Sequence, residues 1–359
     1  MSEFKIIDNH VHVAGPGDSH SGLYWHERFN DGKGFVLLKI IKGWGLRKIT
    51  DKLMVNALLK HTRSSKKVDR MVVLALDNVY DPDGTYRGPD QTNTGDIKTS
   101  LYTANQFVKD LCGQPGNSNL LFGLSVHPFR NDAIAQLETY ERDAVLCKWL
   151  PSSQMIRFDS EVENVQTRLE GFYKKLADVN LPLLLHVGRE DSIPSAGGDE
   201  YQTYNHPRYI EKALDMGVTV ILAHCGCSYF DEPERTDVIP DVLALFKKME
   251  DENKPWKLYA DISAVYSPFR KEKILDEVFR NIKPDYLIYG SDWPNPSKGP
   301  KWWSNPLWIA RYAKSNLIDR YYKICDRWLP VYFSREEIQK IYGNFHELLN
   351  ELGRGHLVG

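Results

Sequence analysis

Two histidines stand two residues apart at the end of an apolar run near the start of the chain, in IIDNHVHV. Successive side chains of a β-strand alternate between its two faces, so His10 and His12 are expected on one face and Val11 on the other. Two imidazoles side by side form a chelating pair for a transition metal. An ordinary polar strand end is the alternative, and this stretch alone does not decide between them.

Further ionisable residues occur at the ends of other apolar runs. His186 ends LPLLLH, His224 ends VTVILAH, Lys148 lies in AVLCKWL, and Asp292 follows DYLIYGS. A single buried histidine is readily explained by a hydrogen bond to a backbone carbonyl. Ionisable groups placed repeatedly at one rim cost desolvation energy unless they meet a metal or one another. The repetition therefore predicts a metal site.

Eight β-rich runs, each followed by a segment of helical character, must position these residues. The runs are FKIIDNHV, DRMVVLAL, LLFGLSV, AVLCKWL, LPLLLHV, VTVILAH, WKLYADIS and DYLIYGS. Several are almost continuously apolar, which is typical of parallel strands covered on both faces. Eight such units predict a (β/α)₈ TIM barrel, whose chemistry lies at the C-terminal ends of the strands. A doubly wound open sheet typically has fewer strands and a glycine-rich turn after the first.

The chain of 359 residues is longer than a minimal barrel, and we expect one domain over residues 1–359. Residues from about 14 to 67 form an insertion after the first strand, with a helix around Lys48–His61, expected over the barrel mouth. A C-terminal extension covers about 293–359. It ends in SREEIQKIYGNFHELLNELG, where Ser334 and Glu337 fit a helix capping box. Helices are also expected over Ser160–Val179, Pro207–Met216 and Pro240–Asp251.

The composition argues against several classes of protein. Lys and Arg total 46 against 48 Asp and Glu, a net charge of −2, which makes nucleic acid and anionic membranes poor partners. We find no signal-peptide pattern and no apolar run near the ~20 residues that span a bilayer, so a cytoplasmic protein is expected. The 5 cysteines, among them Cys225 and Cys227 in a CxC pattern, show no disulfide framework.

The order of these motifs resembles that of the amidohydrolase superfamily, and more narrowly its amidohydrolase-related branch of decarboxylases and lactonases. The similarity rests on the HxH pair, the strand-end His186 and His224, and the GSDWP segment, and it runs from IIDNHVHV to YGSDWPNP. The tail QKIYGNFHELL also resembles the closing helix of that branch.

The resemblance implies a divalent metal, with Zn²⁺ the first expectation and Mn²⁺, Fe²⁺ or Co²⁺ as alternatives. Its implied ligands are His10, His12, His186 and Asp292. Asp292 is also implied to accept a proton from the nucleophilic water, and His224 to act as acid or base or to stabilise an oxyanion. Lys148 leaves two possibilities open. It is either carboxylated, bridging a second metal served by His224, or a cation that binds a substrate anion, and we favour one metal.

The activity expected from this resemblance is a metal-dependent hydrolase of a small, carboxylated molecule, cleaving an amide, lactone or related C–N or C–O bond through a metal-activated water. Non-oxidative decarboxylation of an aromatic or unsaturated acid is the alternative, and a catalytically silent metal-binding barrel that acts as a binding protein comes third. The expected partner is a small-molecule substrate, and the resemblance suggests a homodimer while leaving the oligomeric state open. Substrate contacts are expected from Lys148, His127, Arg189 and Arg130, with Glu190 as a further candidate. Trp44, Trp293, Trp302 and Trp303 either wall an aromatic pocket or simply pack in the core.

Lys148→Met distinguishes the two roles of this lysine. With one metal, the variant keeps about one ion per chain and mainly raises KM for an anionic substrate, because only a charge partner is lost. With a carboxylated lysine bridging two metals, it loses the second ion and kcat collapses. Elemental analysis of both proteins decides, and two ions per wild-type chain would contradict the single-metal expectation.

Overall fold

The structure, a computed structural model, describes residues 4–27, 48–89, 99–190, 192–193, 199–227, 238–267, 270, 272–295, 297 and 315–359. Part of the expected insertion, part of the expected C-terminal extension and three of the expected wall residues (Trp44, Trp302 and Trp303) lie outside these residues. Among the described helices, none is both long and apolar enough to cross a membrane.

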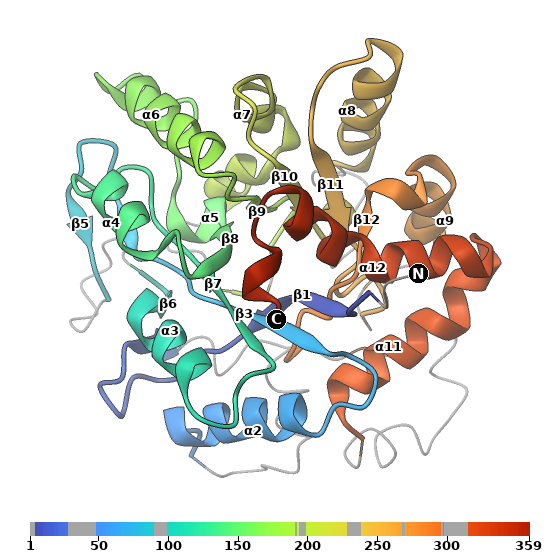
Figure 1. Cartoon of the computed structure of the whole chain (residues 1–359). Helices are drawn as coiled ribbons and strands as arrows, with labels where there is room; N and C mark the ends of the chain where they lie inside the picture. The colour runs from blue at the N-terminus through green and yellow to red at the C-terminus, as the bar shows by residue number, and fades with distance from the viewer. Residues whose placement is uncertain are drawn as a thin grey trace.

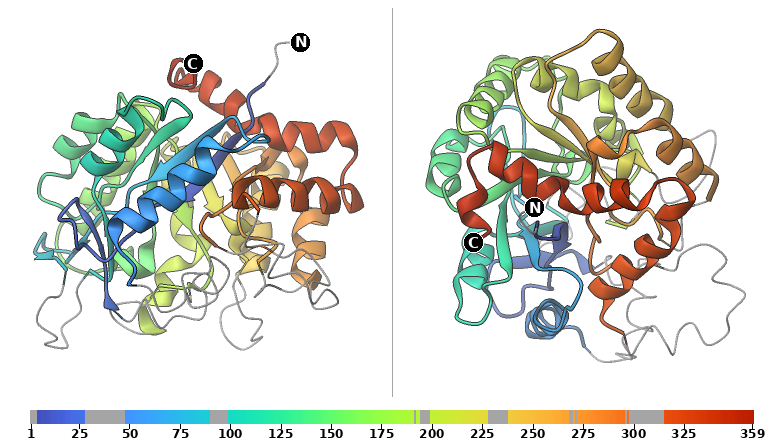
Figure 2. Two further views of the ribbon diagram at one scale, coloured as in Figure 1. Left: turned by 90° about the horizontal axis from the view of Figure 1, so that it is seen from below. Right: turned by 45° about the vertical axis from the view of Figure 1, so that its right-hand side comes forward.

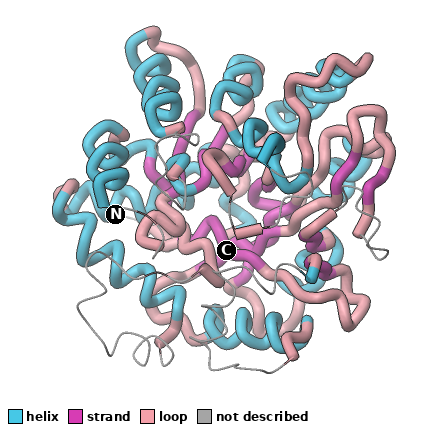
Figure 3. The backbone as a smooth tube through the Cα atoms, turned by 180° about the vertical axis from the view of Figure 1, so that it is seen from behind, coloured by secondary structure: helices cyan, strands magenta, loops and turns pink. Residues whose placement is uncertain are grey.

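All eight runs expected to be strands form one parallel sheet, whose strands are neighbours in chain order. They lie at the centre of the molecule with helices around them (Figures 1 and 3). The strands are shorter than the runs, because residues at one or both ends of each run belong to the adjoining loops. Their bounds are β1 Ile7–His12, β3 Arg70–Leu74, β7 Leu120–Leu124, β8 Ala144–Trp149, β9 Leu183–His186, β10 Val220–Ala223, β11 Leu258–Asp261 and β12 Leu287–Ile288.

Backbone hydrogen bonds between β1 and the segment that follows β12 close the sheet into a barrel. The His12 N–H donates to the Trp293 carbonyl at 2.8 Å, and the Asp292 N–H donates to the His10 carbonyl at 2.8 Å. Gly290 permits this close approach, since a Cβ there would lie 2.2 Å from Asn9 Oδ1. Barrel closure therefore brings β1 and the segment after β12 together at His10, His12 and Asp292, the residues with metal-binding chemistry.

β1 departs from simple alternation. Its pairing with β3 shifts register between Asp8 and Val11, which marks a bulge. Ile7 packs with the inward-facing residues of the other strands, whereas Val11 packs with the outer core beneath the helices. Strict alternation from Ile7 would place both histidines on the outer face. The bulge turns His10 and His12 inward.

The α-helices that surround the barrel are α2 Asp51–Arg63, α3 Asn105–Gly113, α4 Ala133–Tyr140, α5 Pro151–Gln154, α6 Val165–Asp178, α7 Glu211–Asp215, α8 Ile239–Asp251, α9 Glu272–Asn281, α11 Leu317–Trp328 and α12 Arg335–Glu351. Shorter 3₁₀ turns are η2 Asp199–Asn205, η3 Pro207–Ile210, η4 His224–Gly226, η5 Pro284–Tyr286, η7 Leu329–Val331 and η8 Gly355–Leu357.

The helices expected from the sequence form with adjusted starts. The helix expected from Ser160 begins at Val165, after Asn164 in a left-handed conformation, and the one expected over Pro207–Met216 divides into η3 and α7. The capping box of Ser334 and Glu337 is present at the start of α12.

Two small antiparallel sheets lie outside the barrel. β2 Leu23–Trp25 pairs with β6 Leu101–Thr103, and β4 Val79–Tyr80 pairs with β5 Tyr86–Arg87. The β2–β6 pair brings part of the expected insertion against the loop between β3 and α3. An apolar cluster that includes Trp25, Met54 and Leu101 packs there.

α12 covers the end of the barrel at which the strands begin. This end lies opposite the strand ends that carry His186 and Asp261. Its Phe345, Leu348 and Leu349 pack against the inward-facing side chains of the strands. Both ends of the chain lie here (Figure 2), joined by a hydrogen bond from the Lys5 ammonium to the Val358 carbonyl at 3.2 Å.

Arg354 ties the C-terminal residues to this end of the barrel. Its buried guanidinium donates to four backbone carbonyls, those of Glu141, Ala144, Val179 and Asn180, at 2.7–2.8 Å. These carbonyls belong to the turns that lead into β8 and β9.

Arg354→Met should lower the free energy of unfolding by about 3 kcal/mol, because four carbonyls lose a charged donor. Urea unfolding measures the change. Arg335→Met, at an exposed position in the first turn of α12, is the matched control and should change stability by about 0.5 kcal/mol at most. Equal stability of the two variants would contradict the role of Arg354.

Candidate metal centre and active-site cavity

Three side chains from the two joined ends of the barrel meet at one point. His10 Nε2 lies 3.1 Å from His12 Nε2, and Asp292 Oδ1 lies 3.2 Å from His12 Nε2 and 3.7 Å from His10 Nε2. His10 and Asp292 are buried, whereas the His12 side chain is 28% exposed. Two imidazole nitrogens and a carboxylate oxygen this close together form a potential metal-binding group.

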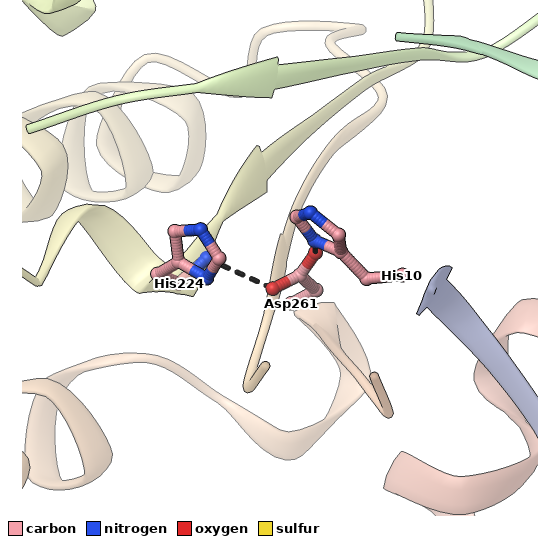
Figure 4. A group of neighbouring side chains, drawn as sticks. All are labelled: His10, His224 and Asp261. Carbon is pink, nitrogen blue, oxygen red and sulfur yellow. Dashed lines mark hydrogen bonds and ion pairs between the residues drawn. The ribbon is translucent and has the colours of Figure 1, made fainter. Parts of the chain in front are cut away.

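Asp261, at the end of β11, holds the other side of His10. The His10 Nδ1–H donates to Asp261 Oδ2 at 2.8 Å (Figure 4). The Ser263 hydroxyl lies 3.1 Å from the same nitrogen. A proton on Nδ1 leaves the lone pair of His10 on Nε2, which faces His12 and Asp292. This is the arrangement by which a carboxylate orients a metal-binding histidine.

His224 is held by the same pair of residues. Its backbone N–H donates to Asp261 Oδ1 at 2.8 Å, and its Nδ1 lies 3.0 Å from the Ser263 carbonyl and 2.7 Å from the Ser263 hydroxyl. Because that hydroxyl donates to Asp261, both neighbours of Nδ1 are acceptors, so Nδ1 carries the proton and Nε2 the lone pair.

His10, His224 and Asp261 also lie close enough together to be considered as ligands (Figure 4). We regard this group as support for the site rather than as a metal position. The Nδ1 atoms of both histidines already donate hydrogen bonds, and Asp261 Oδ1 accepts from two backbone N–H groups. Although burial raises the pKa of Asp261, His10, His224 and the Ser263 hydroxyl outweigh it and hold the pKa below its ordinary value.

His186, at the end of β9, faces the same region from another side. Its Nε2 is buried without a hydrogen-bond partner, 3.6 Å from Glu190 Oε2. Its ring stands edge-on to that of His224, with centroids 5.2 Å apart. Burial lowers the pKa of His186 and of His224 well below the usual value, so both imidazoles are neutral.

Lys148, at the end of β8, is a fully buried lysine whose Nζ lies 3.4 Å from His10 Nε2. Burial lowers the pKa of its ammonium to about 8, although Asp261, Asp292 and Glu190 oppose the shift. Burial also lowers the pKa of His10 to about 4, with a further contribution from Lys148. Near neutral pH the site thus contains a lysine cation beside a neutral His10.

Asp292 is held in a conformation that its neighbours must impose. Its φ of 60° is unfavourable for a residue other than glycine, and such strain is found where surrounding contacts fix the backbone. The Asn295 side chain donates to Asp292 Oδ2. Burial raises the pKa of Asp292, but His224, His12 and His10 outweigh it and hold the pKa well below the ordinary value, so the carboxylate is ionised.

A cavity of about 850 Å³, part of it open to solvent, contains these groups. Its floor includes His10, His12, Lys148, His186, His224 and Asp292, and Glu190 and Ser192 also line it. Its walls are largely apolar and come from Trp25, Met54, Leu76, Leu101, Leu150 and Ile193. The polar atoms are thus concentrated at one end of a cavity large enough for a small organic molecule.

Three residues expected to contact substrate are not among the described residues that line this cavity. The Arg130 guanidinium donates to Asp77 Oδ1 at 3.2 Å and to the Tyr80 hydroxyl at 2.6 Å. The His127 N–H donates to Asp77 Oδ2 at 2.8 Å, so both belong to a polar network that joins the loops after β3 and β7. Arg189 is half-buried.

The other expectations for nearby residues have mixed outcomes. Trp293 is buried in the core and does not line the described cavity, whereas Trp25, which sequence reasoning did not single out, does. Cys225 and Cys227 are both buried in the core as reduced thiols.

Asp261 and Ser263 are the important residues that sequence reasoning missed. A signal was available, because Asp261 and Ser263 lie in the last three residues of the seventh run, WKLYADIS, much as His224 ends the sixth. The strand-end rule that selected the histidines would also have selected this carboxylate.

The chain's own atoms fit a divalent metal at His10, His12, His186 and Asp292. Two imidazole nitrogens face each other at 3.1 Å, a carboxylate oxygen lies beside them, and a third imidazole nitrogen, His186 Nε2, is buried without a hydrogen-bond partner. A buried nitrogen without a hydrogen bond is costly, and a cation supplies the missing interaction. His186 stands farther away than the other three, since it is not part of their compact group.

A sequence model of the family described as amidohydrolase matches residues 75–343. The chain belongs to the amidohydrolase family. The match contains Lys148, His186, His224 and Asp292, and His10 and His12 precede it. Membership makes the protein one of a superfamily of enzymes that use divalent metals. No curated protein matches the sequence.

Solved structures of similar fold agree with the barrel. An uncharacterised TIM-barrel protein from Bordetella bronchiseptica has a TM-score of 0.56 and 14% identity, over 98% of this chain and 100% of that one. A 2,6-dihydroxybenzoate decarboxylase from Rhizobium gives 0.51 and 14%, over 97% and 99%. A dihydroxybenzoic acid decarboxylase from Polaromonas, with bound manganese and the inhibitor 2-nitroresorcinol, gives 0.50 and 14%, over 99% of both chains. The predicted (β/α)₈ TIM barrel is confirmed.

Asp261→Asn should weaken metal binding by about 10- to 100-fold, because the neutral amide no longer fixes the tautomer and orientation of His10. Competition with a chelator measures the affinity. Asp110→Asn, on the exposed side of α3, makes the same chemical change elsewhere and should leave affinity unaltered. An unchanged affinity in Asp261→Asn would refute the supporting role of Asp261.

Proposed function

We propose that this amidohydrolase is a single-metal hydrolase that cleaves an amide, lactone or related ester bond of a small, carboxylated molecule. The observation that carries the proposal is the meeting of His10, His12 and Asp292 at the floor of a cavity that also contains a buried lysine. The atoms suited to bind a metal and the Lys148 ammonium suited to bind an anion lie in the same cavity. Hydrolysis of an anionic substrate needs this arrangement.

His10, His12, His186 and Asp292 would hold the metal, for which Zn²⁺ remains our first expectation. When bound, a divalent metal supplies a water of lowered pKa and polarises the carbonyl to be attacked. Asp292 is suited to carry the proton, because its carboxylate is ionised and lies at the same point as the two histidines. It would accept the proton from the attacking water and return it to the leaving group.

Lys148 would bind the substrate carboxylate. A buried ammonium is stabilised by a counter-ion, and the Lys148 Nζ lies beside the neutral His10 imidazole, 3.4 Å from its Nε2. The apolar walls then hold the rest of the molecule and exclude water from around the reacting group. Binding of this kind fixes the substrate by its charged end.

Of the roles expected for His224 from the sequence, that of a base fits its hydrogen bonds and that of an oxyanion donor does not. With its proton on Nδ1, the Nε2 atom has a lone pair and cannot donate to an oxyanion. We therefore assign it the role of a proton acceptor at the cavity floor, which supports Asp292 in handling protons.

Decarboxylation is a second candidate, favoured by one observation. The apolar walls suit a ring-shaped or unsaturated hydrocarbon body, and two structures of similar fold are dihydroxybenzoate decarboxylases. In this alternative, the residues at the cavity floor would bind the substrate carboxylate, and that carboxylate would leave the substrate as carbon dioxide. The ligand residues are the same, so only the products distinguish the two reactions.

A product assay in ¹⁸O-labelled water should therefore distinguish the two. The metal-loaded protein is offered lactones, amides and aromatic acids, and mass spectrometry follows the label and the carbon dioxide. We expect one ¹⁸O atom in the product carboxylate and no carbon dioxide. Release of carbon dioxide, together with an organic product that carries no ¹⁸O, would select decarboxylation.

The His10→Ala, His12→Ala double variant is the control for this assay. Two ligands are lost, so metal content should fall close to zero and turnover by orders of magnitude. Full metal occupancy in this variant would show that the site is assigned wrongly. A wild-type protein that holds metal but turns over nothing would favour a binding protein.

A further inference from the structure

Glu190 is a second buried carboxylate in the cavity, separate from the group formed by His10, His12 and Asp292. It follows β9 in the segment HVGRE, and its Oε2 lies 3.6 Å from His186 Nε2. Only 6% of the residue is exposed, and it lines the cavity together with Lys148. The mechanism above gives it no task.

The local hydrogen bonds favour the ionised form of Glu190. Its Oε1 accepts from the Ser192 N–H at 2.5 Å, from the Ile193 N–H at 3.1 Å and from the Ser192 hydroxyl. Three donors on one oxygen stabilise a carboxylate over a carboxylic acid. They also hold the Glu190 side chain against the cavity wall, which Ser192 and Ile193 help to form.

The formal charges of the described cavity lining are few. Lys148 contributes one positive charge, and Asp292 and Glu190 contribute one negative charge each. Burial keeps His10, His186 and His224 neutral, and a histidine that binds a metal, as proposed for His12, is neutral as well. Asp261 and Arg270 are buried but do not line the described cavity, and because they carry one charge of each sign they leave the sum unchanged. One divalent metal changes the lining from one net negative to one net positive charge.

We propose that Glu190 restricts the cavity to substrates with a single carboxylate, because its charge leaves only one net positive charge at the metal-loaded floor. The inference rests on the proposed single-metal function and adds a selectivity to it. A substrate with two carboxylates places its second negative charge in a cavity of low polarity near Glu190. Repulsion between like charges is strong there, since water does not screen it.

Glu190→Gln removes the charge but keeps an oxygen for the bonds to Ser192 and Ile193. The measurement is calorimetric binding of benzoate and of phthalate, which differ by one carboxylate, to the zinc-loaded full-length protein. We expect the wild type to bind benzoate at least ~10-fold more tightly than phthalate, and the variant to reduce this ratio ~10-fold or reverse it. Glu190→Asp, which retains the charge, should keep most of the wild-type ratio.

Glu347→Gln is the matched control, because Glu347 is exposed on α12 at the other end of the barrel. It should keep the wild-type ratio. A role of Glu190 limited to anchoring its loop would change the affinity for both acids alike, and an unchanged ratio in Glu190→Gln therefore overturns the proposal.

Metal content separates this inference from the proposed function. If the wild type holds one metal ion and Glu190→Gln holds none, Glu190 is a metal ligand. The selectivity role is then overturned, while the proposed metal centre stands. A wild type that holds no ion overturns both. If Glu190→Gln does not fold, Lys148→Met tests the same net charge of the cavity lining. This variant must weaken phthalate binding more than benzoate binding, and the opposite order overturns the proposal.

Discussion

The closure of the barrel between β1 and the segment after β12 is the constraint on which the rest of the site depends. Two backbone bonds, from His12 to Trp293 and from Asp292 to His10, join residues separated by nearly the whole barrel sequence. Each bond involves a residue whose side chain faces the cavity floor. Formation of the last contact of the barrel and assembly of the imidazole and carboxylate group are therefore the same structural event, and the helices outside serve to hold that contact closed.

Asp261 extends this arrangement to the neighbouring strands. Its Oδ2 accepts a hydrogen bond from the ring of His10, and its Oδ1 accepts one from the backbone N–H of His224. One carboxylate thus links β11 to β1 and to the residue that follows β10. Ser263 completes the link by contacting both rings. The result is a floor in which tautomers are fixed by buried partners rather than by solvent. That explains how several histidines can lie together in a dry environment while remaining neutral and keeping their lone pairs toward the cavity.

The eight strands and the strand-end residues were accessible from the sequence, because parallel strands leave continuous apolar runs and their ends share one rim. The bulge before His10 was not, since adjacent Ile6 and Ile7 allow either phase of alternation. Arg130 and His127 had suitable chemistry and strand-end positions, yet Asp77, which follows β3, binds both. Such pairings depend on how distant loops pack, and no local pattern encodes them. The apolar wall, with Trp25 and Met54, depends on the same long-range packing.

The division of the cavity between floor and wall has an evolutionary consequence. The floor residues lie on or next to barrel strands that share one hydrogen-bonded sheet, whereas Trp25, Met54 and Leu101 belong to β2, α2 and β6, which lie outside that sheet. A mutation in the outer segments reshapes the space available to a ligand without touching the atoms at the bottom. Descendants of this chain could thus acquire new substrates through changes in a few peripheral side chains, while the inherited chemistry passes from one lineage to the next intact.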